Sequence, residues 1–138
     1  MNINSEKDPK IIAQSFVQAF QEMDTEKLSS LFDPHIVMYT ANAEAGVDKI
    51  EGRDELLKRF QSIDYTKARL KLTIPHMMTI EKGKVMMMIH VTARKDNIDF
   101  ENFSAFLCDI KNDKITSLWQ VDAKPANSDE FWKRTLKI

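Results

Sequence analysis

Apolar residues recur at helical spacing in the first third of the chain. Asp8 followed by Pro9 is typical of a helix N-terminus. The apolar face of this predicted helix consists of Ile12, Phe16, Ala19, Phe20 and Met23. A shorter helix is predicted from Asp24 or Thr25 up to Asp33–Pro34, because proline disfavours helical geometry in the residue before it. Residues 53–62 predict a third helix.

Alternating apolar and polar residues replace the helical pattern in the second half of the chain. Long strands are predicted at 67–81, 84–95, 99–111 and 114–124. A shorter strand is expected at 35–42, a polar loop around Gly46 and Gly52, and a short terminal helix from about Asn127 or Ser128. Pro75 removes a ladder donor from the first long strand, which predicts a bulge, a bend or an edge there.

Helices followed by a run of strands joined by short turns indicate the α+β class, with an antiparallel meander covered by helices on one face. The candidate turns are EKGK at 81–84, KDNI at 95–98 and KNDK at 111–114. The chain contains no repeat, low-complexity tract or linker. We therefore expect one domain spanning residues 1–138.

Composition narrows the classes of partner. Lysine plus arginine number 20 against 21 aspartate plus glutamate, so no cationic surplus favours nucleic acid or an anionic membrane. The longest apolar stretch, around Val85 to Val91, is much shorter than the roughly 20 residues of a membrane helix. A polar N-terminus and one cysteine lead us to expect a cytoplasmic protein. The three histidines are widely spaced and the glycines form no phosphate loop, so neither metal nor cofactor is expected.

Three segments carry a resemblance to a known family. They are DTEKLSSLFDPHIVMY at 24–39, EGRDELLKRF at 51–60 and DKITSLWQVDA at 113–123. With the order of elements, they make the chain resemble the SnoaL-like branch of the nuclear transport factor 2-like superfamily. The resemblance implies a curved antiparallel sheet wrapped around helices, forming a cone with an internal pocket. That superfamily includes ketosteroid isomerases, polyketide cyclases, limonene epoxide hydrolases, dehydratases and non-catalytic binding domains, so fold does not fix activity.

Ketosteroid isomerase activity is not expected from the matching positions. Those enzymes use a tyrosine in the first helix, an aspartate base on the first strand and a protonated aspartic acid on a later strand. The corresponding residues resemble Phe16, Tyr39 or Thr40, and Ser104 or Ala105. These residues supply neither the carboxylate base nor the acidic donor that the chemistry needs.

Epoxide hydrolases and polyketide cyclases of the superfamily both depend on aspartates, and the cyclase aspartate matches the last predicted strand. Epoxide hydrolases need an Asp-Arg-Asp arrangement, and the R-x-D match at 94–96 falls at a predicted hairpin tip. Polyketide cyclases of the SnoaL type carry a catalytic aspartate on the last strand, near the position of Asp122. The resemblance therefore implies Asp122 as the acid/base residue. From the residues alone, both Asp122 and His90 have a structural alternative. Asp122 can be a solvated aspartate near a strand end, and His90 can be a hydrogen-bonded core histidine.

Strand register predicts which side chains share a face. If Asp96–Asn97 and Asn112–Asp113 are two-residue turns, His90 faces Phe103, which faces Asp122. One sheet face is then mixed and is expected to line the pocket. It contains Met86, Met88, His90, Phe103, Ala105, Leu107, Leu118, Gln120 and Asp122. The other face is almost wholly apolar and contains Val85, Met87, Ile89, Val91, Ser104, Phe106, Cys108, Ile115, Trp119 and Val121.

These observations predict a small-molecule-binding protein in which Asp122 and His90 share one cavity as catalytic residues. The remaining walls are expected to be Phe16, Tyr39, Met88, Phe103, Leu118 and Gln120. The ligand would be small and apolar or partly polar. The activity would be a cofactor-independent isomerase, cyclase, dehydratase or hydrolase; the alternative is a non-catalytic ligand-binding or dimeric interaction domain. The almost wholly apolar face would be exposed and would form a homodimer.

Overall fold

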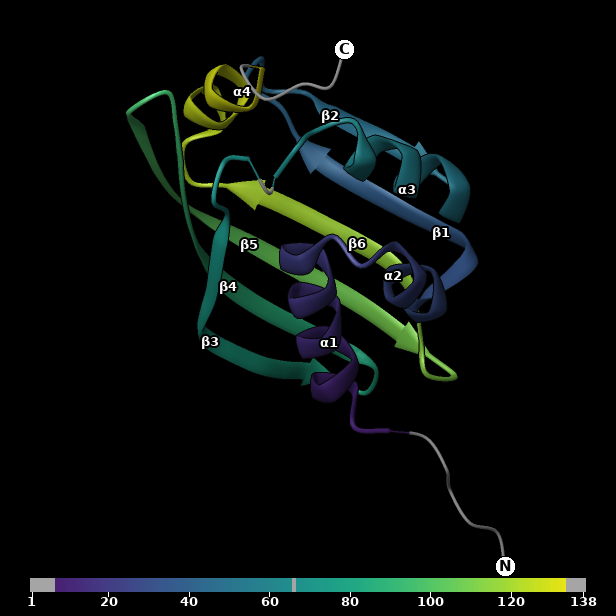
Figure 1. Ribbon diagram of the computed structural model, residues 1–138. Coiled ribbons are helices and arrows are strands. Elements are labelled where there is room, and N and C mark those ends of the chain that lie inside the picture. Colours follow the sequence, from purple (N-terminus) through teal and green to yellow (C-terminus); the bar gives the residue numbers. More distant parts are fainter. Residues whose placement is uncertain (1–6, 66, 134–138) are drawn as a thin grey trace, which may run out of the picture.

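The computed structural model describes residues 7–65 and 67–133 and shows a curved six-stranded sheet with helices on one face (Figure 1). The helices are α1 (Pro9–Glu22), α2 (Thr25–Leu31), α3 (Arg53–Gln61) and α4 (Pro125–Lys133). The strands are β1 (Phe32–Ala41), β2 (Val47–Glu51), β3 (Lys71–Glu81), β4 (Lys84–Lys95), β5 (Ile98–Lys111) and β6 (Lys114–Asp122). Their order in the sheet is β2-β1-β6-β5-β4-β3. The predicted α+β cone is confirmed.

The predicted starts of α1 and α2 are confirmed by their capping bonds, whereas the terminal helix begins at Pro125 and not at the predicted Asn127 or Ser128. The Asp8 side chain accepts a hydrogen bond from the Lys10 N–H (3.0 Å) at the start of α1. Asp24, rather than Thr25, caps α2 by accepting from the Lys27 N–H (3.0 Å). Gly52 precedes α3 with φ 95°, a conformation that favours glycine.

Strand β2 was not predicted from the sequence, and it changes the pairing of β1. Residues 47–51 were expected to be loop, but they pair antiparallel with β1 at the edge of the sheet. Their side chains alternate between exposed and half-buried, so they lack the apolar run that indicates a strand. On its other side β1 pairs parallel with β6, a departure from the expected all-antiparallel sheet. The predicted irregularity at Pro75 is confirmed by a register shift between Thr73 and His76.

Both two-residue turns are confirmed. Lys95 pairs with Ile98 and Lys111 with Lys114. The four turn residues at 96–97 and 112–113 all have positive φ between 54° and 62°, as type I′ hairpins require. The β4–β5 register is also as predicted, with His90 opposite Phe103.

A bulge in β6 makes the predicted β5–β6 register wrong. Ile110 pairs with Ile115 and Asp109 with Ser117, which leaves Thr116 as an extra residue on β6. Asp122 therefore pairs with Ser104 and not with Phe103. Because alternation has a period of two, the extra residue reverses the side-chain directions of β6 beyond it.

Asp109 holds the strands together at this bulge. Its carbonyl accepts a hydrogen bond from the Thr116 hydroxyl (3.2 Å), and its carboxylate accepts from the Ser117 hydroxyl (2.7 Å) and the Lys84 ammonium (2.6 Å). Burial acts to raise the Asp109 pKa, but the hydrogen bonds from Lys84 and Ser117 outweigh it and hold that pKa below its usual value.

The almost wholly apolar face predicted to be exposed is the face that the helices cover. Val85, Met87 and Ile89 are buried in the main core together with residues of α1, α2 and α3. The prediction that this face forms a dimer interface is therefore wrong. Cys108 lies in the same core, and burial raises the pKa of its thiol to about 12, as befits a small buried apolar residue.

The β6 register can be tested with two neighbouring apolar residues. Leu118 is 0% exposed and Val121 is 51% exposed. Leu118→Ala should lower the free energy of unfolding by about 2–5 kcal/mol, because it leaves a cavity in the core. Val121→Ala should change it by about 0.5 kcal/mol or less. Urea denaturation at equal protein concentration measures both, and a larger loss at Val121 would contradict the bulge.

Candidate functional site

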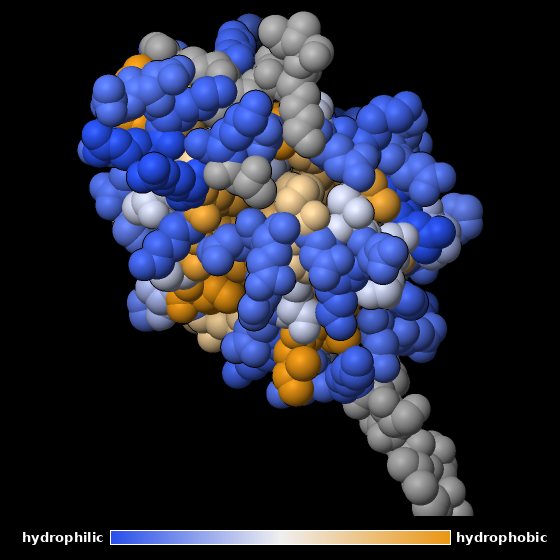
Figure 2. Space-filling view, in the orientation of Figure 1, coloured by the Kyte–Doolittle hydropathy of each residue, from blue (hydrophilic) through white to orange (hydrophobic). Residues whose placement is uncertain are grey.

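A cavity of about 330 Å³ lies between the helices and the inner face of the sheet. Its walls are mainly apolar side chains from α1, β3, β4 and β5. They include Phe16, Phe20, Leu72, Ile89, Val91 and Phe106. Figure 2 shows apolar surface in the middle of the helix-covered side, surrounded by hydrophilic side chains. A volume of this size suits a small organic molecule.

Two apolar clusters bound the cavity. The main core joins α1, α2 and α3 to the sheet. The second cluster consists of Ala68, Ala93, Phe100 and Phe131, with Val91 and Trp132 packed against it. Helix α4 contributes to the second cluster and lies beside the end of the sheet (Figure 1). The cavity is therefore the space that these two clusters leave between them.

Asn102 fastens α4 to β5. Its side chain, 4% exposed, donates hydrogen bonds to the Lys124 carbonyl (2.9 Å) and the Ser128 hydroxyl (2.8 Å). Its carbonyl oxygen accepts from the Lys124 N–H (3.1 Å). A buried amide with this many partners fixes the segment that carries α4 over the cavity.

A polar network lies on the sheet side of the cavity, at the end of β6. Gln120 and Asp122 both point inward because they follow the bulge. The Gln120 amide donates to the Ser104 hydroxyl (2.8 Å) and to Asp122 Oδ1, and its oxygen accepts from the Thr40 hydroxyl. Gln120 therefore uses both amide protons to hold Ser104 and Asp122 in place.

The Asp122 carboxylate has one oxygen in this network and one outside it. Oδ1 accepts from Gln120, whereas Oδ2 has no hydrogen-bond partner in residues 7–65 and 67–133. A carboxylate held at one oxygen, in a cavity with apolar walls, can exchange a proton with a bound molecule through the other.

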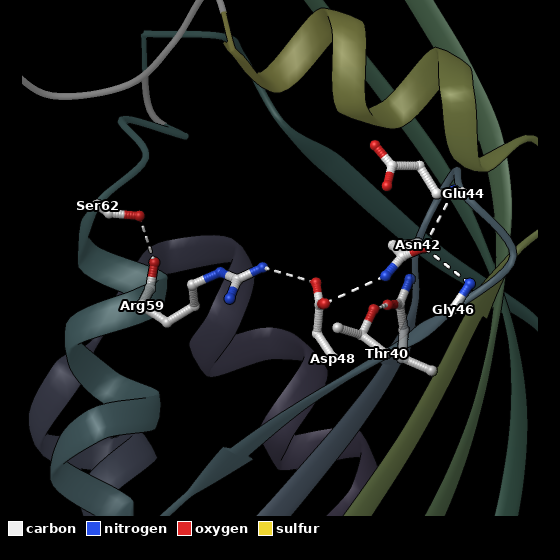
Figure 3. A network of polar contacts seen from close by, with 8 residues as sticks. Thr40, Asn42, Glu44, Gly46, Asp48, Arg59 and Ser62 are labelled. Carbon is white, nitrogen blue, oxygen red and sulfur yellow. Dashed lines mark hydrogen bonds and ion pairs between the residues drawn. The ribbon is translucent and has the colours of Figure 1, made fainter.

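The rim of the cavity carries a second polar group, from α3 and β2. Arg59 of α3 reaches toward Asp48 of β2 at 3.9 Å, and Asp48 accepts a hydrogen bond from the Asn42 amide (3.2 Å) (Figure 3). Asn42 Oδ1 in turn accepts from the N–H groups of Glu44 and Gly46, closing the β1–β2 loop. Arg59 also lines the cavity, so its contact with Asp48 links α3 to β2 at the edge of the cavity.

Three of the predicted site residues line the cavity. They are Asp122, Gln120 and Phe16. Leu118 also points inward but is fully buried in the main core instead. Phe16 brings no hydroxyl to the cavity and Thr40 no carboxylate, so the absence of ketosteroid isomerase activity stays a prediction.

The other four predicted residues lie on the outer face of the sheet, and their placement in the cavity is wrong. His90 contacts Glu101 (2.7 Å) and stacks on the Phe103 ring (4.8 Å between centroids). Met88 is 37% and Phe103 44% exposed. Tyr39 stacks on Trp119 at 4.1 Å. Since His90 and Asp122 are on opposite faces, they do not form a catalytic pair.

Several cavity residues were missed as pocket residues by sequence reasoning. They are Thr40, Arg59, Tyr65, Asn102 and Ser104. Asn102 and Ser104 had a signal, because they interrupt an otherwise apolar alternation along β5 that runs Phe100, Phe106 and Cys108. Tyr65 had none, since it lies in the connection between α3 and β3.

Within residues 7–65 and 67–133 there is no group of three or more His, Cys, Asp or Glu side chains arranged to hold a metal ion. No helix in that part is long and apolar enough to cross a membrane.

Comparison with solved structures shows the fold. Bal32a from a soil-derived mobile gene cassette has a TM-score of 0.76 and 20% identity, over 90% of this chain and 95% of that chain. Rv0760c from Mycobacterium tuberculosis, in complex with estradiol-17β-hemisuccinate, has 0.68 and 17%, over 83% and 93%. An LEH-like epoxide hydrolase from M. tuberculosis has 0.68 and 13%, over 92% and 90%.

Sequence comparison supplies the family. A search of curated proteins found no match. The model of the SnoaL-like domain matches residues 13–118, which span α1 to the inward-facing Leu118 of β6. This chain therefore belongs to the SnoaL-like family, and it shares its fold with a nuclear transport factor 2-like protein from Cytophaga hutchinsonii.

Proposed function

We propose that the protein binds a small, mainly apolar molecule in the cavity and uses Asp122 as the acid/base residue of a cofactor-independent reaction. The observation that carries this proposal is the Asp122 carboxylate, which Gln120 holds by one oxygen while the other is left for a ligand. Isomerisation, cyclisation, dehydration and hydrolysis all use such a group. The alternative is a binding protein with the same pocket and no turnover.

The structural neighbours support a ligand in this type of cavity. One of them is a complex with a steroid hemisuccinate, and another is an LEH-like epoxide hydrolase. Their identities to this chain are below 20%, so they support the class of ligand site and not a particular substrate.

The arrangement of Gln120 and Asp122 favours one proton path. Gln120 occupies Oδ1, so the proton is taken up or released at Oδ2. The mainly apolar walls strengthen the interaction of the carboxylate with a reacting group that displaces water from the cavity. Gln120 acts as a positioning residue, because it donates to Asp122 and is itself fixed by Thr40 and Ser104.

Native mass spectrometry of the protein purified from its own host tests ligand binding. We expect a retained small molecule in the spectrum of the wild-type protein. Its identity supplies the substrate or product for turnover assays. Absence of a retained molecule, together with failure of small apolar compounds to bind, would contradict the proposal.

Asp122→Asn separates catalysis from binding. Asparagine has the same shape and still accepts the Gln120 hydrogen bond, so ligand affinity should change little. The rate of turnover should fall by about 10²–10⁴-fold, the usual contribution of a general acid or base. Asp99→Asn, at an exposed carboxylate paired with Arg94, is the matched control and should retain the rate. Equal turnover in the two variants would favour the non-catalytic alternative.

We also propose that two copies associate through the outer face of the sheet. Large exposed side chains are contiguous there across β3, β4, β5 and β6, with Met78 beside Met86 and Val121 in the same row as Met88. These outward residues are Met78, Met86, Met88, Phe103, Trp119 and Val121. On this face His90 pairs with Glu101 and Lys49 with Glu51, so these opposite charges compensate each other within one copy. Such patches mark interfaces.

Light scattering tests this association. The wild type should have the mass of a dimer at micromolar concentration, and Met88→Lys should have the mass of a monomer, because it places an unpaired charge in the interface. Ile11→Lys is the control, since Ile11 is also an exposed apolar residue but lies on α1. A monomeric wild type would show that the outer face has another role.

A further inference from the structure

Tyr65 lines the cavity from the connection between α3 and β3, and its ring is held on two sides. The ring centroid lies 4.9 Å from that of Phe20 on α1 and 5.0 Å from that of Trp132 on α4. Both contacts are tilted or edge-on, which is a favourable geometry for aromatic pairs. The position of the hydroxyl at the end of this ring is therefore fixed by packing.

The backbone around Tyr65 is fixed as well. Its carbonyl accepts hydrogen bonds from the N–H groups of Ala68 (3.2 Å) and Leu70 (3.3 Å). Ala68 is fully buried, and its own carbonyl accepts from the Arg94 N–H of β4 (2.7 Å). Tyr65 is therefore joined through Ala68 to β4 of the sheet.

The Tyr65 hydroxyl has no hydrogen-bond partner within residues 7–65 and 67–133. Buried tyrosines usually have one. Burial raises the pKa of Tyr65 above its usual range, the Arg59 guanidinium lowers it in part, and the Asp122 carboxylate raises it further. The phenol is therefore protonated at neutral pH, and it lines the same cavity as Arg59 and Asp122.

The side-chain amides of Gln120 and Asn102 near the cavity already donate hydrogen bonds to other residues. Gln120 donates to Ser104 and Asp122, and Asn102 donates to Lys124 and Ser128. The Thr40 hydroxyl donates to Gln120. The phenol of Tyr65 is thus a fixed donor, left for a molecule that enters beside Asp122.

We propose that Tyr65 donates a hydrogen bond to an oxygen of the bound molecule next to Asp122, so that the site selects small apolar molecules carrying a carbonyl, ether or epoxide oxygen. This inference rests on the proposed function, since it requires a ligand in the cavity. A neutral oxygen is favoured over a carboxylate because Asp122 would repel an anion, and Arg59 is already paired with Asp48. Asp122 and Tyr65 would then act on neighbouring atoms of one ligand.

The experiment compares two probes of equal shape, 2-acetonaphthone and 2-isopropenylnaphthalene, in which a methylene group replaces the carbonyl oxygen. Calorimetry should show the ketone binding about five- to tenfold more tightly to the wild type, the value of one hydrogen bond. In Tyr65→Phe this preference should disappear, while the affinity for the hydrocarbon stays within about twofold, because the ring remains in its aromatic contacts. Thermal unfolding checks that the variant is folded.

Tyr39→Phe is the matched control, since Tyr39 is the other tyrosine of the chain and stacks on Trp119 on the outer face. It should retain the preference for the ketone. Carbon-13 labelling of the tyrosine Cζ atoms adds a direct readout: the ketone should shift the Tyr65 signal and leave the Tyr39 signal in place. The two Phe variants assign these signals.

The outcomes distinguish this inference from the proposed function. If both probes bind and the preference for the ketone persists in Tyr65→Phe, the role of Tyr65 is wrong and the binding cavity stands. The same holds if the wild type binds the two probes equally. If neither probe binds the wild type, both this inference and the proposed pocket for small apolar molecules are overturned.

Discussion

One extra residue in β6 decides which side chains this protein presents to its cavity. The bulge at Thr116 shifts the pairing of β6 with β5, and Leu118, Gln120 and Asp122 turn toward the helices as a result. Asp109 stabilises the bulge through its bonds to Thr116, Ser117 and Lys84. Without that residue, Trp119 and Val121 would point inward and the cavity would have no carboxylate on β6.

The cavity exists because the chain builds two apolar clusters and does not fill the space between them. The main core stabilises α1, α2 and α3 on the sheet, and the smaller cluster holds α4 through Phe131. Polar groups in the gap satisfy one another, as Gln120 does with Thr40, Ser104 and Asp122. Such an interior keeps the half-buried Asp122 carboxylate in one orientation without requiring it to be paired with a cation.

Asp122 and Tyr65 both line the cavity and have hydrogen-bonding capacity that the described residues do not use. Asp122 has an oxygen that can accept, and the Tyr65 phenol has a proton that it can donate. They are far apart in the sequence, since Asp122 ends the last strand and Tyr65 lies in the connection before β3. An acceptor and a donor placed together in an apolar cavity recognise a molecule that offers the complementary pair.

The amino-acid sequence by itself determined the α+β class, the helix starts at Asp8 and Asp24, the four long strands and the type I′ turns, because caps, periodicity and turn residues are local signals. It also indicated Asp122, Gln120 and Phe16. The inward direction of β6, the exclusion of His90 and the presence of Tyr65 in the same cavity as Asp122 were decided only by the tertiary structure. A bulge is a property of two paired strands, and a loop residue reaches a cavity through packing, so neither leaves a periodic pattern in the chain.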